Sequence, residues 1–125
     1  MENVLVVDDE SDILKLISEN LLVRGYKVSE AKTGSEAIGK LYSDQPSLLV
    51  LDIKLPDFTG WELLERIDND PEIPKDFPVL IMTASITDAN IDLSDYPNVT
   101  EILIKPFNAS TLVSAVKRSI GRKRQ

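Results

Sequence analysis

The 125-residue sequence contains no cysteine and no histidine. Without cysteine there is neither a disulfide nor a thiolate metal site, and without histidine there is no imidazole to serve as ligand or general base. The sequence also lacks an apolar stretch of membrane-spanning length and the basic, apolar pattern of a signal peptide. Any chemistry must therefore use carboxylates, hydroxyls or amines, and we expect a cytoplasmic protein that does not associate with membranes.

Positive charge is scarce, with 14 Lys and Arg against 21 Asp and Glu and a net charge of −7. Such a surface repels nucleic acid, so no direct nucleic-acid contact is expected, although basic residues gather in the final segment GRKRQ. The length and the 42% hydrophobic content suit one domain with one substantial core. We expect this domain to cover residues 1–121, followed by a basic tail at 122–125.

Short apolar runs rich in β-branched residues alternate with helical patterns along the whole chain. This alternation is typical of βα units that build a parallel sheet. The runs near residues 4, 48 and 79 are almost wholly apolar, as central strands are, whereas the second run alternates like an edge strand. The predicted strands cover residues 3–7, 26–30, 48–52, 78–82 and 100–104.

Capping signals mark the helices between these strands. Apolar residues recur at helical spacing over 13–22, and Gly25 suits a left-handed cap after them. Thr33 and Thr59 are each followed three residues later by glutamate, which predicts helix starts near residues 34 and 60.

The last helix and the loops are less regular. Asn108 can cap a final helix that Gly121 would end. Asp, Asn and Ser are frequent in residues 85–98 and Pro97 interrupts them, so the fourth helix is expected to be short or loosely held. Residues 68–78 read as an extended loop.

Polar residues follow four of the predicted strands: Asp8 and Asp9, then Asp52, Thr83 and Lys105. Each one alone is explained more simply as a cap, a turn or a solvated residue. Parallel strands linked by right-handed crossovers end at one edge of the sheet, however, which brings all of them together. Unpaired carboxylates about 4 Å apart repel by roughly 4 kcal/mol at an effective dielectric near 20, so a cation is expected among them.

The ligand types indicate which cation this is. Oxygen donors without His or Cys favour a hard ion, and few carboxylates with positions left for water and a phosphoryl oxygen suit Mg²⁺ better than Ca²⁺. Lys105 offers a positive charge and Thr83 a hydroxyl to phosphate oxygens. The sequence therefore predicts phosphoryl chemistry at this edge.

The segments VVDDE, LLVLDIKLPDFTG, LIMTA and ILIKPF, in this order, resemble the receiver domain of two-component response regulators over essentially the whole chain. The resemblance implies an α/β fold of the flavodoxin-like type, a (βα)5 three-layer sandwich whose parallel five-stranded sheet has the order 2-1-3-4-5. It implies that Asp52 accepts a phosphoryl group from the phosphohistidine of a sensor histidine kinase or phosphotransfer protein. It also implies that Asp9, Asp52 and the backbone carbonyl of Lys54 bind Mg²⁺, with Asp8 assisting mainly through water.

By the same resemblance, Thr83 and Lys105 contact the phosphoryl oxygens, and a cis bond before Pro106 aims the lysine into the site. Phosphorylation would shift a face made by the fourth helix, fifth strand and fifth helix, which meets a downstream partner or output domain. The protein would be a monomer or a phosphorylation-dependent dimer, and would catalyse only its own phosphorylation and dephosphorylation.

Two positions depart from the family pattern. Ile102 stands where the family commonly has Tyr or Phe, so we hypothesise that order and disorder in residues 85–98 carry the signal instead. Lys54 is either a solvent-facing loop residue or a cation that slows hydrolysis of the phosphoryl group, because an ammonium does not readily activate water.

Neighbouring residues have structural interpretations. Asp57 and Gly60 are expected to shape the loop over the site. Trp61 and Phe107 suit packing at helix starts better than a partner-binding aromatic pair.

Three rival functions differ in what they require. A phosphatase of the haloacid dehalogenase type needs a second aspartate where Lys54 stands. A receiver-like interaction module that is never phosphorylated usually lacks an acidic residue or the lysine, and all are present here. A flavodoxin-type carrier needs a glycine-rich loop after the first strand, which is missing. Whether the chain acts alone or belongs to a longer regulator stays open.

Overall fold

A computed structural model describes residues 2–85, 87 and 91–124. Five parallel strands form one sheet in the order β2-β1-β3-β4-β5, which confirms the predicted order. The strands lie within a residue or so of their predicted positions: β1 Asn3–Val7, β2 Lys27–Ala31, β3 Leu48–Asp52, β4 Val79–Thr83 and β5 Val99–Ile104.

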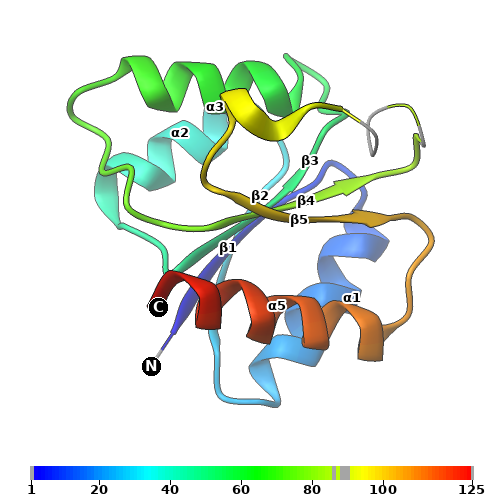
Figure 1. Cartoon of the computed structure of the whole chain (residues 1–125). Coiled ribbons are helices and arrows are strands. Elements are labelled where there is room, and N and C mark those ends of the chain that lie inside the picture. Colours follow the sequence, from blue (N-terminus) through cyan, green and yellow to red (C-terminus); the bar gives the residue numbers. More distant parts are fainter. Residues whose placement is uncertain (1, 86, 88–90, 125) are drawn as a thin grey trace.

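Helices cover both faces of the sheet and complete the predicted three-layer sandwich (Figure 1). One face carries α1 (Ser11–Leu22) and α5 (Ala109–Arg124). The other carries α2 (Gly34–Ser43) and α3 (Gly60–Asn69), and the short 3-10 helix η1 (Leu93–Asp95) precedes β5. Among the described residues, no helix is both long and apolar enough to cross a membrane.

Two expectations about the helices need comment. Gly121 does not end the last helix, because α5 continues to Arg124. A glycine costs a helix only about 1 kcal/mol relative to alanine, and this one does not adopt the left-handed angle that would terminate it. The predicted fourth helix and the switch proposed for 85–98 fall partly on residues 86 and 88–90, which lie outside the described residues.

The predicted caps form at the helix ends. Thr33 accepts the N–H of the third residue of α2, and Thr59 with Glu62 makes a complete capping box on α3. Asn108 accepts an N–H in the first turn of α5, and Gly25 has a φ of 91° just after α1. These local signals determine where each of these helices begins or ends.

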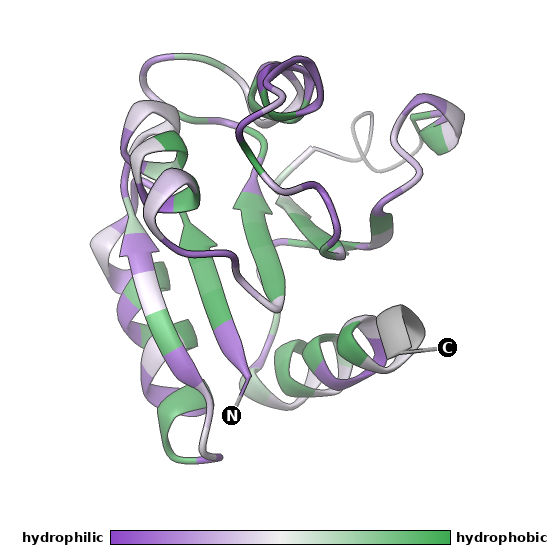
Figure 2. Cartoon of the chain, turned by 90° about the vertical axis from the view of Figure 1, so that its left-hand side faces the viewer, coloured by the Kyte–Doolittle hydropathy of each residue, from purple (hydrophilic) through white to green (hydrophobic). Residues whose placement is uncertain are grey.

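The sheet separates two apolar cores. β1, β3 and β4 are buried on both faces, whereas the edge strand β2 alternates in hydropathy and is half exposed (Figure 2). Because all five strands are parallel, their carboxyl ends meet at one edge of the molecule. The polar residues predicted to matter follow the strands at that edge.

Candidate functional site

Four carboxylates gather beyond the ends of β1 and β3. Asp8 is completely buried and Asp52, the last residue of β3, is 4% exposed, whereas Asp9 and Glu10 are exposed. One oxygen from each of the four lies within 4.8 Å of the others. The sequence analysis placed three of these residues at the site and gave no role to Glu10, although the run DDE contains it.

Lys105, directly after β5, is the cation of this cluster. Its Nζ lies 2.8 Å from Asp8 Oδ2, 3.1 Å from Asp52 Oδ2 and 3.3 Å from Glu10 Oε1. The peptide bond to Pro106 is cis, as expected, and the Lys105 N–H donates to the carbonyl of Thr83 at 2.8 Å. The lysine thus joins strands β1, β3, β4 and β5 at one point.

Burial and like charge dominate the electrostatics. Burial and the charge of Asp8 together raise the pKa of Asp52 to about 6, because the opposing effect of Lys105 and of the Lys54 N–H is smaller. Burial alone lowers the pKa of the Lys105 ammonium, but its hydrogen bonds to Asp8 and Asp52 and their charges raise that pKa above its ordinary value overall. The lysine is therefore firmly charged, whereas Asp52 is an unusually basic carboxylate.

A cavity of about 550 Å³ opens above the cluster. Thr83, the last residue of β4, lies on its wall, and its Oγ1 accepts the N–H of Ser85 at 3.0 Å. Lys54 is exposed, and its N–H donates to Asp52 Oδ1 at 3.3 Å. The cavity is lined by Asp9, Glu10, Asp52, Lys54, Leu55, Pro56, Thr83, Ala84, Ser85 and Lys105.

The donor set fits a hard divalent cation. Four carboxylates face one ammonium, and repulsion from Asp8 already raises the pKa of Asp52. A second positive charge in this cluster would relieve that repulsion, and carboxylate oxygens are ligands that Mg²⁺ prefers. The cluster therefore suits Mg²⁺.

Asp57 fixes the loop between β3 and α3 in a way that the sequence analysis missed. Its carboxylate accepts the N–H groups of Gly34 and Ser35, each at 2.9 Å, and the Ser35 hydroxyl at 2.9 Å. Burial alone raises its pKa, but these bonds and the N–H of Phe58 outweigh it and lower the pKa to about 2. Asp57 thus caps α2 from another element, across more than twenty residues of sequence, so no local pattern announces it.

Gly60, the first residue of α3, brings the two ends of the same loop together. Its N–H donates to the carbonyl of Ile53 at 2.7 Å, and a Cβ at this position would lie 2.7 Å from the backbone oxygen of Asp52. Only a residue without a side chain allows α3 to begin this close to β3. The loop that carries Lys54 is therefore held at both ends.

The aromatic and switch positions are part of the packing. Trp61 and Phe107 are partly buried against the two opposite cores, which agrees with packing at helix starts. Ile102 is half-buried against the core beneath α2 and α3.

Comparison with known proteins identifies the family. Residues 4–117 match the response regulator receiver domain. The chain is 32% identical over 121 residues to the alkaline phosphatase synthesis transcriptional regulatory protein PhoP of Bacillus subtilis, covering 97% of this chain and 49% of that protein. It is 30% identical over 127 residues to the probable transcriptional regulator ycf27 of Guillardia theta, covering 97% and 46%. The chain therefore spans about half the length of these curated relatives.

Solved structures agree with this match. A two-component response regulator from Clostridium difficile has a TM-score of 0.87 and 29% identity, with 100% of both chains covered. A CheY-like receiver domain protein from Methanospirillum hungatei has a TM-score of 0.84 and 28% identity, with 99% of this chain and 97% of that chain covered. The chain belongs to the receiver domain family of two-component response regulators.

Proposed function

We propose that Asp52 is the phosphoacceptor of this receiver domain. The observation that supports the proposal most strongly is the position of Asp52: buried at the end of a central strand, bonded to Lys105, and open to a cavity that also reaches Asp9 and Thr83. A carboxylate with a raised pKa is a better nucleophile than an ordinary one, and its neighbours can hold the transferred group.

In the proposed reaction an Asp52 oxygen attacks phosphorus in line with the leaving nitrogen of a phosphohistidine. The new O–P bond forms as the P–N bond breaks, and the imidazole leaves with the electron pair. Lys105 and the Thr83 hydroxyl offset the charge on the phosphoryl oxygens, so little acid-base help is needed.

Mg²⁺ is the proposed cofactor, held by Asp9, Asp52 and the backbone carbonyl of Lys54, with Asp8 assisting. When bound, it neutralises charge on the transferring phosphoryl group. Lys105 already forms ion pairs with Asp8 and Asp52. Its positive charge therefore reduces the repulsion between these two buried carboxylates before the ion binds.

The proposed partners are a sensor histidine kinase or phosphotransfer protein upstream, and downstream a protein or output domain that meets the face of the fourth helix, β5 and α5. We place the domain in the cytoplasm, and infer that it turns over no substrate beyond its own phosphoryl group and makes no nucleic-acid contact itself. PhoP and ycf27 are named as transcriptional regulators, which concerns those longer proteins.

The test is incubation with a small phosphodonor, with and without Mg²⁺, followed by intact-protein mass spectrometry. The protein should gain the mass of one phosphoryl group only with Mg²⁺, and Asp52→Asn should gain none. Sustained release of phosphate from many substrates would favour the phosphatase instead. No mass gain under any condition would favour the phosphorylation-independent module.

Lys54 can be tested on the labelled protein. If its ammonium affects attack by water, the lifetime of the acyl phosphate will differ between the parent protein and Lys54→Ala. Equal lifetimes would leave Lys54 as a solvent-facing residue.

A further inference from the structure

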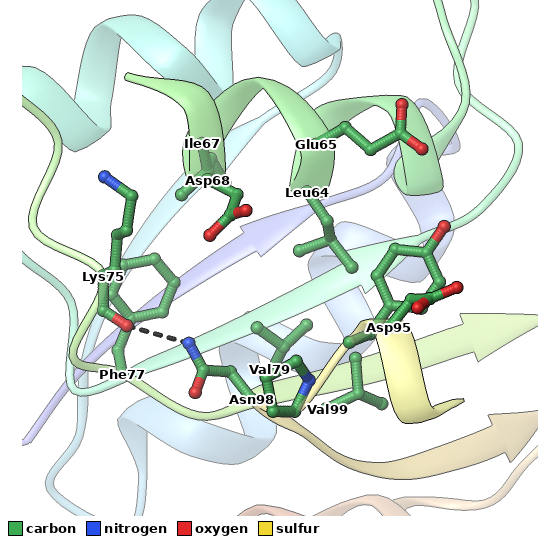
Figure 3. A pocket seen from close by; sticks show the side chains of 12 residues that line it. Leu64, Glu65, Ile67, Asp68, Lys75, Phe77, Val79, Asp95, Asn98 and Val99 are labelled. Carbon is green, nitrogen blue, oxygen red and sulfur yellow. Dashed lines mark hydrogen bonds between the residues drawn. The ribbon is translucent and has the colours of Figure 1, made fainter. Parts of the chain in front are cut away.

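A second pocket lies away from the cluster of Asp8, Asp9, Glu10 and Asp52. It is formed between the second half of α3 and the segment that leads into β5 (Figure 3). We call it the α3 pocket. Its apolar wall consists of buried Ile67, Phe77 and Val79 with half-buried Leu64 and Val99. Val79 and Val99 begin their strands, so the pocket lies toward the opposite edge of the sheet from Asp52.

The size of the α3 pocket suits one side chain. Its volume is about 110 Å³. An engineered apolar cavity of about 150 Å³ is large enough to bind benzene, so this pocket matches a single apolar side chain such as leucine.

The rim of the α3 pocket is acidic. Glu65, Asp68 and Asp95 are exposed, and none of them forms an ion pair within the described part of the chain. Burial raises the pKa of Tyr96, and the charges of Glu65 and Asp95 raise it further. The pocket mouth therefore has a negative potential.

Among the described residues that line the α3 pocket, Lys75 is the one cation, and its ammonium is hydrogen-bonded to backbone carbonyls. The Nζ of Lys75 donates to the backbone carbonyl of Asp70 at 2.6 Å and approaches that of Ile73 at 3.4 Å. The Lys75 carbonyl in turn accepts the amide of Asn98 at 2.9 Å, the bond drawn in Figure 3. These bonds tie Lys75 to its own loop, so it does not neutralise the carboxylates across the pocket.

A short series of contacts connects the pocket to strand β3, which carries Asp52. Gly60 packs against the backbone of Asp52, and the next residue, Trp61, packs against Tyr96 with ring centroids 4.8 Å apart and ring planes tilted by 37°. Tyr96 lines the α3 pocket. Because Trp61 is the single tryptophan of the chain, its fluorescence reports on this wall alone.

We propose that the α3 pocket is a docking site for a protein partner that inserts one large apolar side chain flanked by lysine or arginine. Burial of the apolar side chain in the pocket favours binding. The carboxylates of the rim attract basic residues on either side of it and repel acidic residues and nucleic-acid phosphates. Its α3 wall lies outside the face of the fourth helix, β5 and α5, although residues 95–98 and Val99 border that face, and the pocket is present without phosphorylation. Its test is therefore independent of the role of Asp52.

The experiment titrates the unphosphorylated full chain with a synthetic peptide in which one leucine is flanked on both sides by lysine and arginine. Calorimetry measures the affinity of the peptide, and a change in Trp61 emission shows that the peptide binds near the α3 pocket. The leucine peptide should bind about tenfold or more tightly than the same peptide with serine, since roughly 1.4 kcal/mol of side-chain burial corresponds to tenfold. Binding should change Trp61 emission.

The matched variants are Asp68→Lys on the rim and Glu19→Lys, an exposed acid on α1 at the opposite face, which change the net charge equally. Asp68→Lys should weaken binding severalfold and Glu19→Lys should not. Equal affinity for the two peptides, an equal loss in both variants, or unchanged Trp61 emission would overturn the proposal. So would self-association that Asp68→Lys abolishes, because it would assign the pocket to a second copy of the chain.

Discussion

At the scale of single residues, Asp52 shows how the fold raises the pKa of a carboxylate. Its ordinary pKa is 3.8, and burial followed by the charge of Asp8 raises the folded value to about 6. Lys105 limits this rise without cancelling it. The proposed phosphoacceptor is therefore a residue whose ionisation destabilises the folded state.

This conflict gives a prediction for Asp52→Asn, which removes the charge and keeps the shape. Between about pH 4 and 6 the folded parent holds a proton on Asp52 that the unfolded chain has lost, so its stability falls as pH rises through this window. In metal-free buffer, Asp52→Asn should gain stability relative to the parent from pH 4.5 to pH 7.5, measured by urea denaturation. Asp12→Asn, at an exposed acid outside the cluster, is the control. A difference between parent and Asp52→Asn that is the same at both pH values would contradict the account.

At the scale of elements, the loop from β3 to α3 is fixed by contacts at both ends. Asp57 caps α2, the Phe58 ring packs on Gly34, and the guanidinium of Arg66 lies 4.0 Å from the centroid of that ring. Helix α2 and the loop that carries Lys54 are therefore stabilised together.

Asp57→Ala should destabilise the protein by about 1 kcal/mol at neutral pH, the usual cost of losing a cap. Because the folded pKa of Asp57 is lowered to about 2, its contribution is complete above pH 4 and is lost as pH falls through about 2. The free energies of unfolding of the parent and of Asp57→Ala, measured by chemical denaturation, should become more similar as the pH is lowered. Asp57→Asn, which keeps an acceptor oxygen, should lie between them. A difference in stability between the parent and Asp57→Ala that is unchanged at pH 2 would argue against the cap.

Two glycines allow a matched comparison. Gly60→Ala puts a Cβ against the Asp52 backbone, so α3 or β3 must move, and both stability and phosphorylation rate should fall. Gly39→Ala in the middle of α2 meets nothing within 4 Å and should stabilise by about 0.5–1 kcal/mol. Thermal unfolding together with the phosphorylation rate of each variant checks this pair. A harmless Gly60→Ala would show that the close approach is not required.

At the scale of the whole molecule, local patterns predicted most of the fold because they depend on neighbours in sequence. Alternating apolar runs placed every strand, and caps such as Thr59 placed the helix starts. The positions of Asp8, Asp52 and Lys105 at strand ends also predicted that they would meet, because the carboxyl ends of parallel strands lie at the same edge of the sheet. The cap by Asp57 and the contact of Glu10 with Lys105 were missed, since each depends on where the side chain of one residue lies relative to a residue far away in the sequence.

The central claim is that topology gathers several carboxylates and makes one of them, Asp52, the acceptor. The most direct test is to phosphorylate the protein with a small phosphodonor and Mg²⁺, reduce the acyl phosphate with borohydride, and sequence the peptides by mass spectrometry. Reduction converts a phosphorylated aspartate into homoserine, so the acceptor is marked in the chain. The account predicts homoserine at position 52 alone, and only when Mg²⁺ was present. Homoserine at position 8 or 9, or at no position, would contradict it.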